Sequence, residues 1–216
     1  MCGISGLFLK DASLEPELGA MLAGMIEPLG DRGPDSAGFA IYGSEISGAL
    51  KFTLCIGKKT DPERFVREMQ ATIGVELSQS TRGNHIVLAV PLAAEEATRA
   101  YLASSSMVEV VSSGRRMEVY KEVGRPEVVS KFFGLQEMCG THAIGHTRMA
   151  TESAVTTNGA HPFTAGLDQC LVHNGSLSNH NAVRRQLIRH DLTFRTENDS
   201  EVAAGYLTWR MRNGLS

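Results

Sequence analysis

The order of apolar and polar positions predicts strands and helices along most of the chain. Continuous apolar runs are typical of buried strands and lie at residues 3–9, 39–42, 49–56 and 85–90. Helices are predicted over residues 14–29, 61–77 and 95–102. Pro16 and Gly30 lie near the start and after the end of the first helix, and Asp61-Pro62 supplies an N-cap and a first residue for the second.

The second half of the chain continues this pattern. Residues 107–111 and 115–123 predict a hairpin that turns at residues 112–114. Further elements are predicted as a helix over 126–133, a strand over 168–172, a helix over about 179–190, and a final helix over about 202–211 that residues 196–201 precede. Residues 45–135 carry no cluster of catalytic side chains, and we interpret this stretch as an α/β insertion in which His85 is a buried strand histidine.

Composition narrows the class of protein. The chain has 216 residues, 42% of them hydrophobic and 21% charged, which is ordinary for a globular protein. A net charge of −3 gives no electrostatic reason to expect nucleic acid or an anionic membrane as a partner. No apolar run approaches the roughly 20 residues that span a bilayer, and no basic region of a secretory signal precedes Cys2. The four cysteines are widely spaced and form no CxxC pair, so we expect reduced thiols in a cytoplasmic protein.

The first candidate for chemistry is Cys2, which follows the initiator methionine directly. If Met1 is removed, Cys2 carries a thiol and a free α-amine on the same carbon, and a small residue at position two generally permits that removal. An α-amine ordinarily has a pKa of about 8 and a cysteine thiol of about 8.5, so an α-amine can serve as a base for a neighbouring sulfur. By itself, the stretch fits an incidental cysteine at a frayed terminus equally well.

Histidines in the second half raise the alternative of a metal site, and they are His142, His146, His161 and His173. A zinc site normally adds a close cysteine or carboxylate at a motif spacing such as HExxH, which the sequence lacks. We therefore expect no metal. Acyl transfer explains the polar residues of this region better than a metal site does. An amide under attack by a thiol needs hydrogen-bond donors where the oxyanion forms.

Three further sites suit an amino-acid amide as substrate. Asn174 and Gly175 could donate to an oxyanion, although Asn-Gly is also a common turn pair. Arg148 could hold a carboxylate bidentately, or be a solvated surface arginine. Asp199 could pair with an ammonium, or be an ordinary helix cap. One site for an amino-acid amide explains all of these residues together, whereas each alternative explains only one of them.

These residues occur in motifs that resemble the class II glutamine amidotransferases, which are N-terminal-nucleophile hydrolases. The matching segments, in chain order, are Cys2-Gly3-Ile4, residues 31–38 (DRGPDSAG), residues 145–151 (GHTRMAT), Ala160-His161-Pro162, His173-Asn174-Gly175 and residues 198–201 (NDSE). The resemblance implies an α+β fold, namely a four-layer α/β/β/α sandwich that spans residues 1–216 with the insertion at about 45–135. It also implies that further strands of the second sheet follow Ser216.

The resemblance further implies a role for each site residue. Cys2 would attack the side-chain amide of L-glutamine to give a glutamyl thioester and ammonia, and water would then release glutamate. The other roles implied are an oxyanion hole from Asn174 and Gly175, carboxylate binding by Arg148 with Thr151 nearby, ammonium binding by Asp199, and bracing of the loop beside the nucleophile by Arg32. Glu152 stands where several family members have histidine, so the edge of the pocket is expected to differ.

The ammonia acceptor is expected to belong to another subunit. The insertion and residues 145–153 look most like stand-alone amidotransferase subunits of glutamate synthase and N-methylglutamate synthase type complexes. Partner synthase subunits would supply flavin and iron–sulfur chemistry, because this chain has neither a cofactor fingerprint nor a cysteine cluster. The alternatives are an amidotransferase for an amino sugar, asparagine or a purine precursor, and a non-catalytic glutamine-binding regulatory subunit, which retention of Met1 would favour.

Overall fold

A four-stranded antiparallel sheet, sheet A, joins the first strand to segments from distant parts of the chain. The computed structural model describes residues 2–150 and 154–214. The order of the strands is β1–β8–β2–β7, and their bounds are Gly3–Phe8, His142–Arg148, Ser36–Tyr42 and Met117–Val123. The strand predicted over 39–42 begins earlier, at Ser36, because the end of the glycine-rich loop already pairs with β8.

The register of sheet A determines which side chains share a face. Gly3 lies opposite Thr147, and Ser36 lies opposite Arg148. Because side chains alternate along a strand, Arg148 and His146 are on the same face as Lys121 of β7. We call this face the inner face of sheet A.

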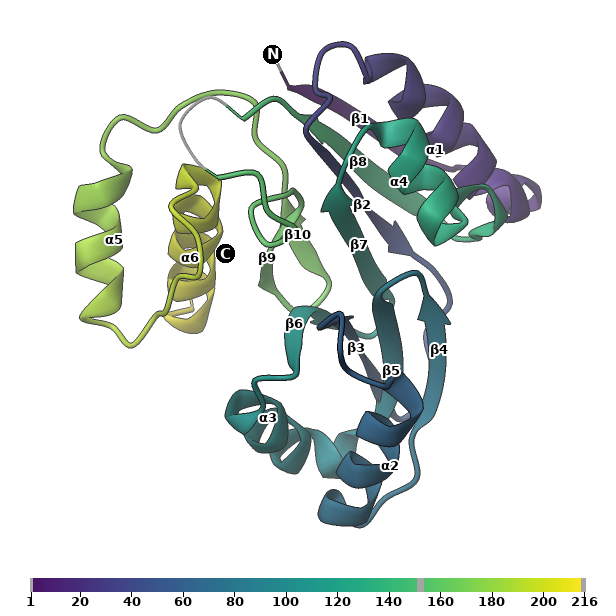
Figure 1. The fold of residues 1–216 in the computed structure, drawn as a ribbon, viewed down its shortest axis with the longest axis vertical. Helices are drawn as coiled ribbons and strands as arrows, with labels where there is room; N and C mark the ends of the chain where they lie inside the picture. Colours follow the sequence, from purple (N-terminus) through teal and green to yellow (C-terminus); the bar gives the residue numbers. More distant parts are fainter. Residues whose placement is uncertain (1, 151–153, 215–216) are drawn as a thin grey trace.

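The outer face of sheet A is covered by two helices, α1 (Leu18–Ile26) and α4 (Pro126–Phe133). Figure 1 shows both helices along this side of the sheet. Leu22 and Ile26 pack with Phe39 in a fully buried core. The helix α1 is shorter than the predicted 14–29, because Pro16 and Pro28 fall in 3-10 segments at Ala12–Glu17 and Glu27–Leu29.

The inner face of sheet A is partly covered by a two-stranded sheet, β9 (Phe163–Gly166) and β10 (Gln169–Leu171). Beyond it, α6 (Asp199–Arg212) packs on β9, and α5 (His180–Ile188) packs on α6 (Figure 1). The layers therefore follow the order helix, sheet, sheet, helix, and the predicted α+β class is confirmed.

Sheet B is a separate four-stranded antiparallel sheet from the middle of the chain. Its strand order is β4–β5–β3–β6, with bounds Ser78–Arg82, His85–Pro91, Ala49–Ile56 and Val108–Gly114. Two helices bury one of its faces, α2 (Pro62–Ile73) and α3 (Glu95–Ser104). The helix α2 ends at Ile73 rather than at residue 77, because Gly74 adopts a left-handed conformation with φ of 74°.

The predicted hairpin of residues 107–123 is wrong, because β6 pairs with β3 in sheet B and β7 pairs with β2 in sheet A. Asp168 stabilises the crossing between the sheets. Its carboxylate accepts the backbone N–H groups of Arg115 and Arg116, each at 2.8 Å, and of Met117 at 2.9 Å. The segment interpreted as an insertion therefore contributes β7 and α4 to sheet A and its helical layer.

Replacing Asp168 with alanine is expected to lower the free energy of unfolding by roughly 2–4 kcal/mol, because three charge-assisted hydrogen bonds are lost. Chemical denaturation measures the change. Asp168→Asn is the matched control, because asparagine keeps one carbonyl acceptor and also tolerates the left-handed φ of 56° at this position. We expect a smaller loss in Asp168→Asn than in Asp168→Ala. An unchanged free energy of unfolding in Asp168→Ala would show that the carboxylate does not hold the crossing.

Candidate active site

A cavity of about 550 Å³ lies where β1 begins and β8 ends. Its lining includes residues that are far apart in the sequence, namely Cys2, Arg148, Asn174, Gly175 and Asp199. The structure thus brings together most of the residues predicted to form the site. Thr151, which was predicted beside Arg148, lies outside the described residues.

Cys2 contacts the turn that was predicted to form the oxyanion hole. The side-chain amide of Asn174 donates through Nδ2 to the carbonyl oxygen of Cys2, at 2.9 Å. The thiol Sγ lies 3.8 Å from the carbonyl oxygen of Met149. A side chain at Gly175 would place Cβ 2.9 Å from Nε2 of His173, so the close approach of the neighbouring ring explains the glycine.

Arg148 is a buried arginine at the end of β8. The residue is 5% exposed, and Nη1 donates to the carbonyl oxygen of Ala154 at 3.3 Å. The alternative of a solvated surface arginine is therefore wrong. A guanidinium held inside a cavity is suited to bind a carboxylate, because little water competes for its N–H groups.

Asp199 begins α6 but does not cap it. Asn198 is the N-cap, and its side chain accepts the N–H of Ser200 at 2.9 Å. The carboxylate of Asp199 lines the cavity and accepts the backbone N–H of Leu177 through Oδ2 at 2.7 Å. The helix-cap alternative is therefore wrong for Asp199, and its carboxylate faces the same cavity as Arg148.

The loop before β2 is fastened to β8 through Asp35, a residue of the 31–38 motif for which the sequence predicted no separate role. Oδ2 of Asp35 accepts the N–H of Ala150 at 2.8 Å, and its own N–H donates to the carbonyl oxygen of Arg148 at 3.0 Å. Arg32 is exposed and is not among the described residues that line the cavity. The bracing role of Arg32 stays a prediction, whereas Asp35 makes bracing contacts.

Three of the four clustered histidines lie at or beside the cavity. Nε2 of His146 lies 3.0 Å from the carbonyl oxygen of His173, and the ring of His146 stacks on that of His161 with centroids 4.1 Å apart. Burial lowers the pKa of His146 to about 4 and that of His161 to about 2, so both rings are neutral at pH 7. His142 instead stacks on Tyr42. Within residues 2–150 and 154–214, no group of three or more His, Cys, Asp or Glu side chains is arranged to hold a metal ion.

Buried neutral histidines are expected to make the protein acid-sensitive. Burial lowers the pKa of His85 to about 3, as it lowers that of His146 to about 4. Below pH 6.5 the unfolded chain binds these protons and the folded chain does not, so stability falls as pH decreases from about 6.5 to about 4. Each histidine contributes a slope of up to about 1.4 kcal/mol per pH unit.

Urea unfolding at a series of pH values measures this slope. His85→Phe keeps an aromatic ring and is expected to remove the share that His85 contributes to the pH dependence. An unchanged slope in that variant would mean that His85 already binds its proton in the folded protein.

Comparisons with known proteins identify the family to which this chain is similar. A glutamine amidotransferase domain family matches residues 133–210. Glutamine amidotransferase-like protein GlxB of Rhizobium meliloti is 52% identical over 215 residues, which cover 99% of this chain and 71% of that protein. The chain belongs to the class II glutamine amidotransferases. The resemblance stated from the sequence motifs is thereby confirmed, and the family is one of enzymes that take glutamine as substrate and deliver ammonia to an acceptor.

Other relatives of this amidotransferase match to different extents. A putative glutamine amidotransferase of Methanothermobacter thermautotrophicus is 33% identical over 228 residues, covering all of the chain and 74% of that protein. Glutamine–fructose-6-phosphate aminotransferase of Treponema pallidum is 33% identical over 108 residues, 50% of this chain and 17% of that protein.

No described helix of this amidotransferase has the length and apolar character to cross a membrane.

Proposed function

We propose that the chain hydrolyses L-glutamine to glutamate and ammonia through a thioester on Cys2 and delivers the ammonia to a synthase partner. The observation that carries the proposal is the single cavity lined by Cys2, Arg148, Asn174, Gly175 and Asp199. Its volume of about 550 Å³ is typical of small-molecule sites. A cation, an anion and a thiol around one cavity match the carboxylate, ammonium and amide of a free amino-acid amide.

The proposed chemistry is an acyl transfer in two steps. The thiol proton of Cys2 passes to the free α-amine, and the sulfur forms a bond to the amide carbon of glutamine. The carbon–nitrogen bond then breaks as the amine returns the proton to the leaving nitrogen, which departs as ammonia. Water attacks the thioester, its hydroxyl completes glutamate, and its proton restores the thiol.

Asn174 and Gly175 stabilise the oxyanion in this proposal. One N–H of the Asn174 amide donates to the Cys2 carbonyl, which keeps the amide group beside the nucleophile. Its second N–H and the backbone N–H of Gly175 are the proposed donors. Removing one such donor typically costs about 10²–10³ in rate.

The proposed partner is a synthase of the glutamate synthase or N-methylglutamate synthase type, whose subunits would carry the flavin and iron–sulfur chemistry. The likeness of residues 45–135 and 145–153 to stand-alone amidotransferase subunits of such complexes supports this assignment. The free thiols of all four cysteines support a cytoplasmic setting. An acceptor such as fructose 6-phosphate is the second candidate, because part of the chain is similar to an amino-sugar enzyme.

The test combines the mass of the intact N-terminus with an assay of glutamate release from glutamine by the wild-type chain. We expect loss of Met1 and measurable glutamate. Glutamine binding without turnover, on a chain that keeps Met1, would instead identify a regulatory subunit. Co-purification of the native complex then identifies the acceptor.

Arg148→Lys is expected to raise KM for glutamine by about 5–150-fold, which corresponds to about 1–3 kcal/mol for a lost charged hydrogen bond. Lysine keeps the charge but cannot grip a carboxylate bidentately. Initial-rate kinetics measure KM. The matched control is Arg64→Lys, because Arg64 is an exposed residue of α2. If KM is unchanged, Arg148 does not bind the carboxylate.

A further inference from the structure

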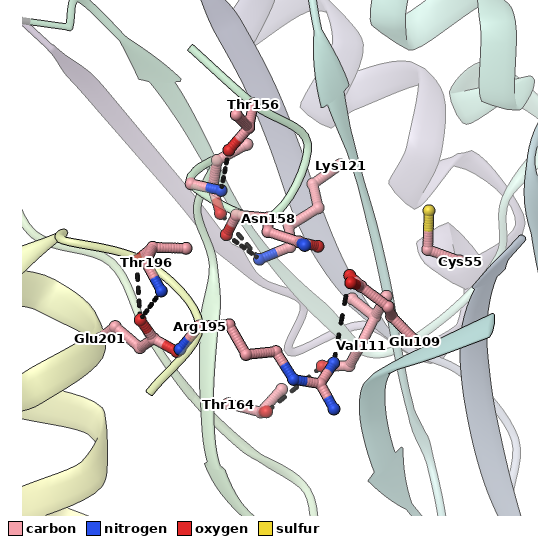
Figure 2. A network of polar contacts seen from close by, with 12 residues as sticks. Cys55, Glu109, Val111, Lys121, Thr156, Asn158, Thr164, Arg195, Thr196 and Glu201 are labelled. Carbon is pink, nitrogen blue, oxygen red and sulfur yellow. Dashed lines mark hydrogen bonds and ion pairs between the residues drawn. The ribbon is translucent and has the colours of Figure 1, made fainter. Parts of the chain in front are cut away.

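A buried lysine anchors the segment beside the active-site cavity. Lys121 is 6% exposed, and its Nζ donates to three carbonyl oxygens, those of Asn158 (3.2 Å), Ala160 (2.8 Å) and Pro162 (3.3 Å). Figure 2 shows Lys121 reaching from β7 to the segment that contains Asn158. An ammonium has three N–H groups, so all of them are used on this one segment. Lys121 therefore fixes the backbone on both sides of His161.

His161, held in this way, supports the ring of His146. The two rings stack with centroids 4.1 Å apart, and His161 is 4% exposed and lines the cavity. Opposite Lys121 on β2, a side chain at Gly38 would place Cβ 2.2 Å from the carbonyl oxygen of His161. The segment therefore lies directly on the inner face of sheet A, and the ring of His146 is enclosed between the sheet and His161.

His146 connects this buried pair to the proposed oxyanion turn. A carbonyl oxygen only accepts, so Nε2 of His146 carries the proton and donates to the carbonyl of His173 at 3.0 Å. Nδ1 of His146 is buried without a hydrogen-bond partner among the described residues, which agrees with a neutral ring protonated at Nε2. Asn174 and Gly175 follow His173 directly.

A second contact holds the same turn from the side of α6. Nδ1 of His173 lies 3.3 Å from Oγ of Ser200, and that hydroxyl lies 3.3 Å from Oδ1 of Asp199. The turn is therefore fixed at the His173 carbonyl by His146 and at the His173 ring by Ser200. Of these two contacts, the first lies on the backbone that leads into Asn174.

We propose that His146 is a positioning residue for glutamine hydrolysis, which holds the Asn174–Gly175 turn in place through the carbonyl of His173. The inference rests on the proposed function and adds a residue that does not touch the reacting atoms. An oxyanion hole works only if its donors are already placed where the charge develops. A buried hydrogen bond to the preceding carbonyl supplies that placement, and the His161 ring and Lys121 keep the donor from moving.

The test compares three substitutions that differ in where they place a donor. In His146→Gln the amide nitrogen occupies the position of Nε2, in His146→Asn the donor is one carbon too short, and in His146→Met it is absent. We expect kcat for glutamine to fall about 10–100-fold in the Asn and Met variants and to stay within about fivefold of wild type in the Gln variant. KM should change by less than about threefold in all of them, because Arg148 and Asp199 remain.

Two further measurements distinguish a displaced turn from a misfolded chain and from a damaged nucleophile. Unfolding curves identify a variant that does not fold. If His146→Met does not fold, the comparison of His146→Gln with His146→Asn still tests the proposal. Alkylation of Cys2 by iodoacetamide should proceed at wild-type rates in all folded variants, because it needs no oxyanion hole. Equal losses in Gln and Asn, or a rise in KM alone, would overturn the inference. Absence of glutamine turnover in the wild type would overturn the proposed function instead.

Discussion

Cys2→Ala is expected to reduce glutamate release by roughly 10⁴-fold or more, the size of effect seen when a catalytic nucleophile is removed. Without the sulfur no thioester can form, and neither Arg148 nor Asp199 can replace it as a nucleophile. Binding should persist, because both charged side chains remain in the cavity. The assay follows glutamate release at saturating glutamine, and calorimetry follows glutamine binding by the inactive variant.

The control for this variant is Cys139→Ala. Cys139 is an exposed free thiol whose Sγ contacts the carbonyl of Pro16, and it is not among the described residues that line the active-site cavity. Its replacement is expected to leave turnover unchanged. If Cys2→Ala retains normal turnover, another group is the nucleophile, and the chemistry proposed for this cavity is wrong.

The strongly patterned elements could be predicted from the sequence. Continuous apolar runs predicted β3 and β5 closely, and the Asp61-Pro62 pair predicted the start of α2 correctly, although not its end. The site residues Arg148, Asn174 and Asp199 were identified because chemistry restricts which side chains bind an amino acid. The sequence predicted that they form one site, but it could not show how the fold brings them together, since this depends on the antiparallel register of β1, β8 and β2.

Two kinds of feature escaped the sequence pattern for physical reasons. The strand β4 has the sequence Ser-Gln-Ser-Thr-Arg, which carries no apolar periodicity because it is an edge strand with exposed side chains. The crossing between sheets depends on Asp168, which is far from residues 115–117 in sequence. The same holds for Asp35 and His146, whose partners are backbone groups that no local pattern reveals.

Gly33 lies in the glycine-rich loop of residues 31–38, and its role in the fold is steric. In a glycine-rich loop its presence is explained by turn chemistry, yet Gly33 is not among the glycines with positive φ. The structure gives a different reason, because a Cβ at Gly33 would lie 2.5 Å from the carbonyl carbon of Thr147 and 2.7 Å from the backbone nitrogen of Arg148. The loop and β8 approach so closely that only glycine fits.

Gly33→Ala is therefore expected to lower the free energy of unfolding by about 1–3 kcal/mol, the usual cost of overpacking. It should also reduce kcat/KM for glutamine by more than about tenfold, because a small displacement of a binding group weakens catalysis strongly. The backbone that must move carries Arg148. Chemical denaturation and initial-rate kinetics measure the two effects.

Gly24→Ala is the matched control, because Gly24 lies inside α1 and a Cβ there meets no described atom within 4 Å. The same chemical change should raise the free energy of unfolding by about 0.5–1 kcal/mol, since alanine favours a helix over glycine. Opposite signs from the same substitution separate steric crowding from backbone entropy. If Gly33→Ala behaves like Gly24→Ala, the loop can move away from β8 at no cost, and Arg148 does not depend on that contact for its position.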